Sequence, residues 1–220
     1  MQRHFEQELD QLKTTLIQMG SLVDSQIDAA ARALFEADVV LALRVIADDD
    51  RVNGYDTEID RQCQQIFALN QPVAADLRLL MSALRINNQI ERIGDIAVNI
   101  AERVEPLAAH TAFLRSTRLE EMLQIARIMV SDSLNAFIHN NPSLAMRVLE
   151  SDDVVDDLDR NIFLQLVNEM KSNHEIIEPA AHIIILSRHI ERLADHATNI
   201  AEDVIFLVDA KIVKHNALDE

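Results

Sequence analysis

Apolar residues recur every three or four positions along most of the chain, the spacing that places them on one face of an α-helix. The pattern is clearest near the C-terminus, where one predicted face carries Leu186, Ile190, Leu193, Ala197, Ile200 and Val204. Breaks in the pattern coincide with Pro72 and Pro142, each of which follows a polar dipeptide. Because proline favours the first turn of a helix, these positions predict helix starts and an all-α protein.

The chain contains two copies of one pattern. Residues 90–104 and 190–204 are identical at ten of fifteen aligned positions, and residues 41–53 resemble residues 144–156. The two matches are collinear, with offsets of 100 and 103 residues. Similarity at a nearly constant offset indicates an internal duplication.

Each copy is predicted to form three helices. They cover residues 5–36, 39–69 and 72–105 in the first copy, and residues 112–139, 142–173 and 176–213 in the second. Because short connections between long helices favour antiparallel neighbours, we expect six long antiparallel helices in two tandem three-helix bundles. The first bundle is predicted to span residues 1–107 and the second residues 108–220.

Composition and charge restrict the class of function. Only three of the 220 residues are glycine, and the formal net charge is −17. A chain this acidic is repelled by nucleic acids and anionic lipids, so neither is an expected partner. No apolar run reaches the roughly 18–20 residues of a membrane span, and the N-terminal sequence has no apolar signal core. We expect a cytoplasmic protein without direct membrane insertion, held at the inner membrane, if at all, through partner proteins.

Acidic and amide side chains line up on the third helix of each copy, with i, i+4, i+8, i+11 spacing. The two lines are Glu91, Asp95, Asn99 and Glu102, and Glu191, Asp195, Asn199 and Glu202. Acids one helical turn apart repel each other by roughly a few tenths of a kcal/mol. Because both copies repeat this unfavourable arrangement, it indicates a binding role.

The second helix of each copy carries a further acidic line. It consists of Asp49, Asn53, Asp56 and Asp60 in the first copy, and of Asp152, Asp156 and Asp159 in the second. These lines flank the apolar stripe, so we expect them to face the third helix of the same copy. Oxygen donors from two helices suit divalent or trivalent metal ions, with Mg, Mn, Ca, iron and zinc all compatible. The alternative is that each line is only the solvated face of a helix.

The two ERxxD segments, at residues 91–95 and 191–195, are each followed by Asn-Ile-Ala-Glu, and the chain here resembles the PhoU family. Pro72 with the nearby Asp-Leu-Arg at residues 76–78 adds to the likeness, which extends over essentially the whole chain. This family comprises regulators of bacterial phosphate-specific transport and of the phosphate-starvation response. The resemblance implies two three-helix bundles with surface metal clusters, most often of iron or zinc.

Carried over position by position, the resemblance implies two metal sites. The first would use Asp49, Asn53, Glu91 and Asp95, and the second Asp152, Asp156, Glu191 and Asp195. Further candidate ligands are Asp56, Asp60, Asn99, Glu102, Asp159, Asn199 and Glu202. Asn53 brings no charge where the second copy has Asp156, so we expect the first site to bind metal more weakly.

The resemblance also implies a non-enzymatic role in signal transduction. The implied partners are the ATPase subunit of the phosphate-specific ABC transporter and a phosphate-responsive sensor histidine kinase, and a homodimer is compatible with it. The protein would couple these partners and keep the starvation response off when phosphate is plentiful. Two alternatives stay open: a helical di-metal carboxylate enzyme and a metal-free structural bundle. The enzyme is disfavoured because no glutamate has a histidine three residues later, as such sites require.

Overall fold

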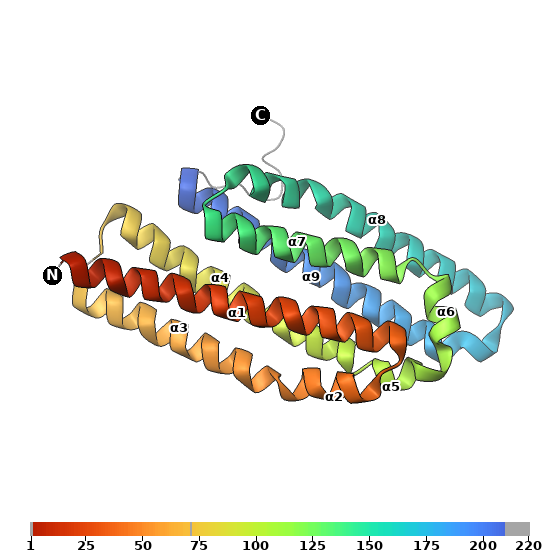
Figure 1. Cartoon of the computed structure of the whole chain (residues 1–220). Helices are drawn as coiled ribbons and strands as arrows, with labels where there is room; N and C mark the ends of the chain where they lie inside the picture. Colours follow the sequence, from red (N-terminus) through yellow and green to blue (C-terminus); the bar gives the residue numbers. More distant parts are fainter. Residues whose placement is uncertain (1, 71, 210–220) are drawn as a thin grey trace.

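The computed structural model describes residues 2–70 and 72–209, and all regular structure in these residues is helical (Figure 1). In chain order the elements are α1 (Gln2–Glu36), α2 (Val39–Ala47), α3 (Asp49–Asn70), α4 (Ala74–Ala101), α5 (Val104–Leu107), η1 (Ala108–His110), α6 (Thr111–Ser116), α7 (Leu119–His139), α8 (Pro142–Ser172), η2 (His174–Ile176) and α9 (Ile177–Asp209). The predicted all-α class with six long helices is confirmed.

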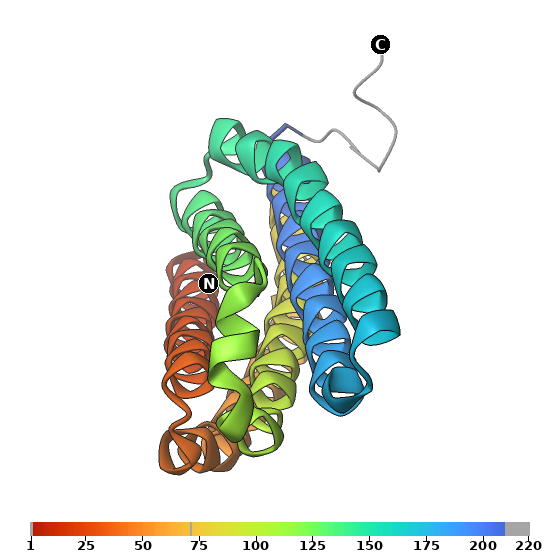
Figure 2. The ribbon, with the colours of Figure 1, turned by 90° about the vertical axis from the view of Figure 1, so that its right-hand side faces the viewer.

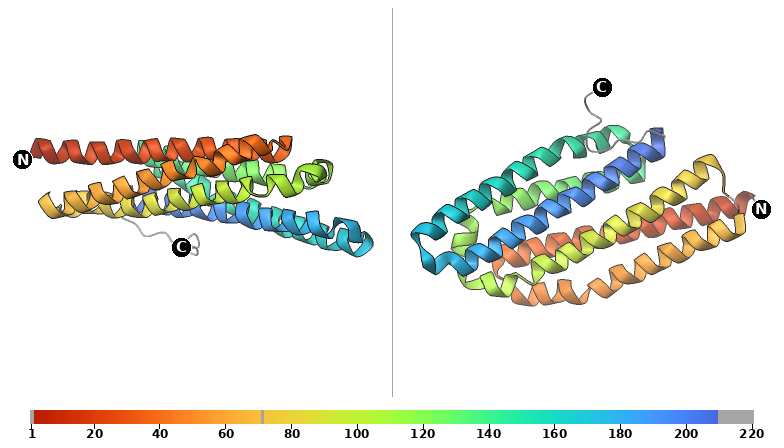
Figure 3. Two further views of the ribbon diagram at one scale, coloured as in Figure 1. Left: turned by 90° about the horizontal axis from the view of Figure 1, so that it is seen from below. Right: turned by 180° about the vertical axis from the view of Figure 1, so that it is seen from behind.

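The long helices form two groups of three that pack side by side (Figure 2). The first group is α1, α3 and α4, the second is α7, α8 and α9, and within each group every helix contacts the other two. The groups meet where α4 packs against α9 and α1 against α7. Seen from behind, α8, α9, α4 and α3 follow one another across the molecule, with α1 and α7 on the far side (Figure 3). The predicted division at residue 107 stays a prediction.

The apolar stripes form one continuous core. All six residues of the face predicted on the last helix, from Leu186 to Val204, are buried. Cys63 of α3 is also fully buried, and burial raises the pKa of its thiol to about 12. The apolar period of the sequence therefore identified the core-facing positions correctly.

The helix predicted over residues 72–105 ends at Ala101, before α5, and two further predicted helices are interrupted. The helix predicted over residues 39–69 is divided at Asp48 into α2 and α3, so that Asp49 and Asp50 lie in the first turn of α3. Acids are favourable at the positive N-terminal end of a helix and unfavourable at the negative C-terminal end, which explains a break directly before them. The last predicted helix is described as far as Asp209, and its predicted end at Val213 lies outside the described residues.

The second interruption divides the helix predicted over residues 112–139 at Thr117. This residue is extended, with φ −89° and ψ 167°. Its hydroxyl donates to the Leu114 carbonyl at 2.7 Å and accepts from the Leu119 amide at 3.3 Å. Such local side-chain hydrogen bonds compete with helix formation, and apolar spacing does not reveal them.

The same turn joins the first and second long segments in both groups. Ala37 follows α1 with φ 56°, and Asn140 follows α7 with φ 47°. The next residue caps the following helix: Asp38 accepts from the Leu41 amide at 2.9 Å, and Asn141 accepts from the Leu144 amide at 3.1 Å. The duplication therefore extends to the backbone conformation of this turn.

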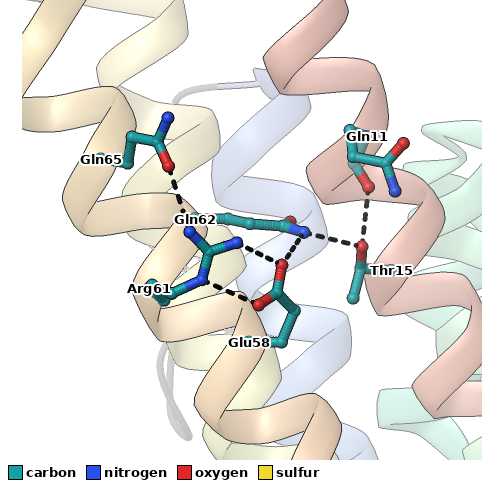
Figure 4. Close-up of polar contacts among 6 residues, drawn as sticks. All are labelled: Gln11, Thr15, Glu58, Arg61, Gln62 and Gln65. Atoms are coloured by element: carbon teal, nitrogen blue, oxygen red, sulfur yellow. Dashed lines mark hydrogen bonds and ion pairs between the residues drawn. The ribbon is translucent and has the colours of Figure 1, made fainter.

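A polar contact joins α1 to α3 on the flank of the first group (Figure 4). The Gln62 amide donates to the Thr15 hydroxyl at 3.2 Å and to Glu58 at 2.8 Å. Arg61 donates to both carboxylate oxygens of Glu58, at 2.7 and 2.9 Å. Hydrogen bonds from Arg61 and Gln62 lower the pKa of Glu58 to about 2. The Gln62–Thr15 hydrogen bond joins α3 to α1, while α3 also packs against α4.

Polar contacts also run along the seam between α4 and α9. The pairs are Gln89 Oε1 with His196 Nδ1 at 2.7 Å, Arg85 Nη1 with Asp203 Oδ1 at 2.9 Å, and Arg103 Nη1 with His182 Nδ1 at 3.5 Å. Because the Gln89 oxygen accepts, His196 donates from Nδ1. Among the described helices, none combines the length and the apolar character needed to cross a bilayer.

Candidate metal centres

The structure brings the two acidic lines of the first group together. We call the line on α3 (Asp49, Asn53, Asp56, Asp60) with Glu91 and Asp95 of α4 the first acidic cluster. Burial raises the pKa of Glu91, and the negative charges of Asp95, Asp56 and Asp49 raise it further. The pKa of Asp49 is likewise raised by burial and by Asp95. Carboxylates from α3 and α4 therefore lie within electrostatic reach of each other, as the sequence predicted.

Sequence reasoning missed one member of the first cluster. Asn87 of α4 is 1% exposed, and its amide donates to the Asp56 carboxylate at 2.7 Å and more weakly to Asp60 at 3.4 Å. Burial and the charge of Asp60 raise the pKa of Asp56, while the Asn87 hydrogen bond opposes them. Asn87 lies one turn before Glu91, so extending the acidic line backwards along the helix would have found it.

The second group repeats this convergence. The second acidic cluster contains Asp152, Asp156 and Asp159 of α8 with Glu191 and Asp195 of α9. Burial raises the pKa of Glu191, and Asp195, Asp159 and Asp156 add to the rise. The positive charge of Arg188 lowers it. Both copies therefore hold carboxylates from two neighbouring helices in mutual repulsion.

Arg188 is the member of the second cluster that sequence reasoning missed. Its guanidinium donates to the Asp159 carboxylate at 2.8 Å, where the Asp159 side chain is only 6% exposed and that of Arg188 is 59% exposed. The first copy has Asn88 at the equivalent position, so the repeat pattern gave no signal for this arginine. The ion pair partly neutralises the second cluster from its edge.

Several predicted ligands point elsewhere or have other partners. The Asn53 amide donates to Asp49 at 3.0 Å. Asn199 turns toward α4, where its amide donates to Gln89 at 3.4 Å. Glu102 ends α4, and its charge acts on His189 of α9. These three side chains are therefore less suitably placed to bind a metal ion than the carboxylates from α3, α4, α8 and α9.

Each cluster contains a buried oxygen that accepts no hydrogen bond, Oδ1 of Asn87 in the first and Oδ1 of Asp159 in the second. Buried acceptors without partners are rare in proteins and are commonly satisfied by a bound ion or water. As the side chains lie, the described residues contain no group of three or more acids, histidines or cysteines that could hold an ion. The donor chemistry of the two clusters fits a hard cation.

A family model described as the PhoU domain matches the chain twice, over residues 16–104 and 119–204. The two matches cover both halves of the duplication and leave α5 and α6 between them. A relative from Aquifex aeolicus, named phosphate-specific transport system accessory protein PhoU homolog, is 39% identical over 97% of this chain and 96% of its own length. A relative of the same name from Pseudomonas aeruginosa is 36% identical over 98% of this chain and 90% of its own.

Solved structures give the same result. The crystal structure of PhoU from Pseudomonas aeruginosa superposes with a TM-score of 0.88 at 35% identity, and covers 94% of this chain and 100% of its own. The phosphate transport system regulatory protein PhoU from Streptococcus pneumoniae gives a TM-score of 0.86 at 27% identity, over 96% of this chain and 99% of its own. Sequence, repeated domain match and fold agree, and the chain belongs to the PhoU family.

Proposed function

We propose that this protein is a metal-binding regulatory adaptor that represses phosphate uptake and the phosphate-starvation response when phosphate is plentiful. The names of its relatives, which describe accessory proteins of phosphate-specific transport, support the transport assignment. The observation that supports metal binding is the pair of duplicated acidic clusters, each with a buried oxygen that has no partner.

The proposed metal is iron or zinc, with Mg, Mn or Ca compatible with the same oxygen donors. In the first cluster Asp49, Glu91 and Asp95 would hold it, with Asp56 beside them. In the second cluster the holders would be Asp152, Asp156, Glu191 and Asp195. A bound cation offsets the repulsion between carboxylates on neighbouring helices, so it stabilises the contact of α3 with α4 and of α8 with α9.

The proposed partners are the ATPase subunit of the phosphate-specific ABC transporter and the phosphate-responsive sensor histidine kinase. Both clusters belong to the four helices that build one face of the molecule (Figure 3). Two similar sites on one face suit an adaptor, because a rigid face holds two bound partners at a fixed distance from each other. These partners place the protein in the cytoplasm at the inner membrane.

The regulatory role is tested by deleting the gene. Expression of phosphate-starvation genes in phosphate-rich medium is expected to rise in the deletion strain and to return to normal when the wild-type gene is restored. Unchanged expression in the deletion strain contradicts the regulatory role.

The role of the clusters is tested in the same strain with a variant in which Glu91, Asp95, Glu191 and Asp195 are replaced by alanine. This variant is expected to leave the starvation genes expressed. A matched control replaces four exposed acids outside the clusters, Asp10, Glu36, Glu105 and Glu150, by alanine, and is expected to restore repression. Full repression by the cluster variant contradicts a role for the metal.

The adaptor role is tested by affinity purification from phosphate-replete cells. Wild-type protein is expected to recover both the ATPase subunit and the kinase, and the cluster variant is expected to recover less of at least one of them. Recovery of neither partner by wild-type protein contradicts the adaptor. We also propose a homodimer, which the family resemblance allows; sedimentation of the same preparation tests it, and a mass of one chain contradicts it.

A further inference from the structure

Two arginines from the repeated ERxxD segments lie at the same level along the seam between α4 and α9. Gln89 lies opposite His196, and Arg103 lies opposite His182. Gln89 and Arg103 are fourteen residues apart along the chain, and their partners His196 and His182 are fourteen residues apart on α9. The antiparallel register is therefore constant between the two pairs. Arg92, three residues beyond Gln89, is therefore level with the residue next to Arg192. The duplication thus places equivalent arginines across the seam from each other.

Electrostatics supports this placement. Burial lowers the pKa of His196 to about 4, and the positive charges of Arg192 and Arg92 add to that shift, while Asp95 opposes it. One imidazole therefore feels both guanidinium groups, although they belong to different helices. A third arginine, Arg103, acts together with Arg192 on His189 of the same seam. Three guanidinium groups therefore act on the histidines of this seam, with the acids of the two clusters beside them.

Both arginines are accessible from one side. Arg92 and Arg192 are exposed, and the far side of α4 and α9 is covered by α1 and α7. Because they are exposed and α1 and α7 cover the far side, we assign them to the face of the molecule along which α8, α9, α4 and α3 follow one another, a helix order that Figure 3 shows. On this face the arginine pair lies between the first acidic cluster on one side and the second acidic cluster on the other.

The contacts that Arg92 makes on its own helix are weak. Its guanidinium lies 3.5 Å from Glu91 and 3.9 Å from Asp95, and the side chain is 51% exposed. Exposed ion pairs of this length contribute little, so a ligand can replace them at small cost. The Nε of Arg103, a buried donor without an acceptor, lies eleven residues farther along the chain and is not part of the arginine pair. The exposure of Arg92 and its weak ion pairs leave its guanidinium available to a negatively charged ligand.

We propose that the α4–α9 seam is a binding site for a phosphate group, held between Arg92 and Arg192. Guanidinium groups bind phosphate through paired, charge-assisted hydrogen bonds, and two of them approaching from opposite sides suit a tetrahedral oxyanion. The phosphate group belongs either to free inorganic phosphate or to a nucleotide. The site joins the two copies of the duplication, since each copy supplies one arginine.

The flanking acids make this site depend on the clusters. Glu91, Asp95, Glu191 and Asp195 repel an anion on the seam until a cation neutralises them. The inference therefore rests on the proposed metal binding for its strength: phosphate is expected to bind more tightly to the metal-loaded protein. A ligand that tightens only when both clusters are filled would report on the state of the whole molecule.

The test is equilibrium dialysis of untagged protein against radiolabelled inorganic phosphate in phosphate-free buffer, before and after metal removal by a chelator. A second series uses labelled ADP, which separates the two sources of the phosphate group. Wild-type protein is expected to bind one of the two ligands. Arg92→Gln and Arg192→Gln are each expected to weaken binding about tenfold or more, and the double variant to abolish it.

The matched control is Arg160→Gln, which removes an exposed arginine of α8 that pairs with Asp157 away from the seam. It is expected to leave binding unchanged. The metal content of every variant is measured on the same samples. If wild-type protein contains metal but binds neither phosphate nor ADP, the inference is overturned and the proposed function stands. If phosphate binds but the arginine variants bind it equally well, the ligand sits on the metal and the arginine site is wrong.

Discussion

The two acidic clusters occupy equivalent places in the two copies but differ in what surrounds the acids. In the first cluster three carboxyl groups, Asp49, Asp56 and Glu91, have raised pKa values from burial and mutual repulsion. The only buried partner that donates to them from α4 within the described residues is the neutral amide of Asn87. In the second cluster a guanidinium, Arg188, pairs with the most buried acid, Asp159.

The two copies therefore share the positions of their acids but differ in the side chain that pairs with a buried acid, a neutral amide in the first cluster and a guanidinium in the second. Asn53 removes a charge that the second copy has at Asp156, while Asp60 adds one where the second copy has Phe163, so each cluster contains five acids. Arg188 makes the second cluster less negative from the other side, which the sequence did not predict. The relative metal affinity of the two sites therefore depends on an arginine outside the family signature, and it can be altered without touching a proposed ligand.

Among the changes considered, removing Arg188 is expected to have the largest effect on stability and on metal affinity. Arg188→Gln leaves the buried Asp159 carboxylate without its partner, so the metal-free protein should lose about 2 kcal/mol of unfolding free energy. The same change removes a positive charge beside the site, so zinc should bind the second cluster about tenfold more tightly. Urea unfolding and a zinc titration measure the two effects. Weaker zinc binding would show that Arg188 supports the site.

Removing Asn87 tests the first cluster in the same way. Asn87→Ala deletes the amide that donates to Asp56, and about 1 kcal/mol of unfolding free energy should be lost. The neighbouring Asn88→Ala is the matched control, because Asn88 is exposed and makes no described contact with the cluster. Urea unfolding of both variants separates them. Equal stability of the two variants would mean that the amide contributes nothing to the first cluster.

The repeated turn gives a smaller difference between the copies. Ala37 and Asn140 both have positive φ, but asparagine tolerates this conformation better than alanine. Ala37→Gly is expected to raise the unfolding free energy by about 0.5–1 kcal/mol. Asn140→Gly is expected to change it by less than half as much, and thermal unfolding measures both. A destabilised Ala37→Gly would mean that helix propensity outweighs backbone strain at this turn.

The pH dependence of stability should have the same direction for both clusters and should differ between them only in size. In the metal-free protein the raised pKa values of Asp49, Asp56 and Glu91 mean that the folded state holds more protons than the unfolded state over a range above about pH 4. Unfolding free energy therefore falls as pH rises through this range, from full stabilisation below the unfolded pKa. Replacing the three acids by their amides should flatten the slope.

The second cluster supplies the comparison for that experiment. Burial and neighbouring acids raise the pKa of Glu191, so Glu191→Gln, a single change, should flatten the slope less than the triple amide variant does. Urea midpoints at pH values from about 4 to about 7 measure both, after chelation of metal. If Glu191→Gln flattens the slope more than the triple amide variant does, the stronger repulsion between carboxylates lies in the second cluster and not in the first.

Most of the fold followed from the sequence because apolar spacing reports which side of a helix is buried. The core face of α9 and the helix start at Pro142 were both predicted correctly. The breaks at Asp48 and Thr117 were missed, since each depends on local charge or on a side-chain hydrogen bond. Neither alters the apolar period.

The acidic residues were singled out from the sequence mainly where the two copies agree, and their role as metal ligands stays a prediction. Glu91, Asp95, Glu191 and Asp195 were found because they repeat. Asn87 and Arg188 were missed because their equivalents, Ser187 and Asn88, are different residue types. A search by repetition identifies what both copies share, whereas the partners that neutralise each cluster are particular to one copy. Only the packing of α3 on α4 and of α8 on α9 places them.

The central claim is that carboxylates from adjacent helices hold cations in both halves of the molecule. Elemental analysis of untagged protein, expressed as metal atoms per chain, tests it most directly. We expect metal in the wild-type protein, less in the variants Glu91→Ala/Asp95→Ala and Glu191→Ala/Asp195→Ala, and none when all four changes are combined, with the helical circular dichroism unchanged. An unaltered metal content in the fourfold variant, or a wild-type protein that takes up no metal from solution, would contradict the account.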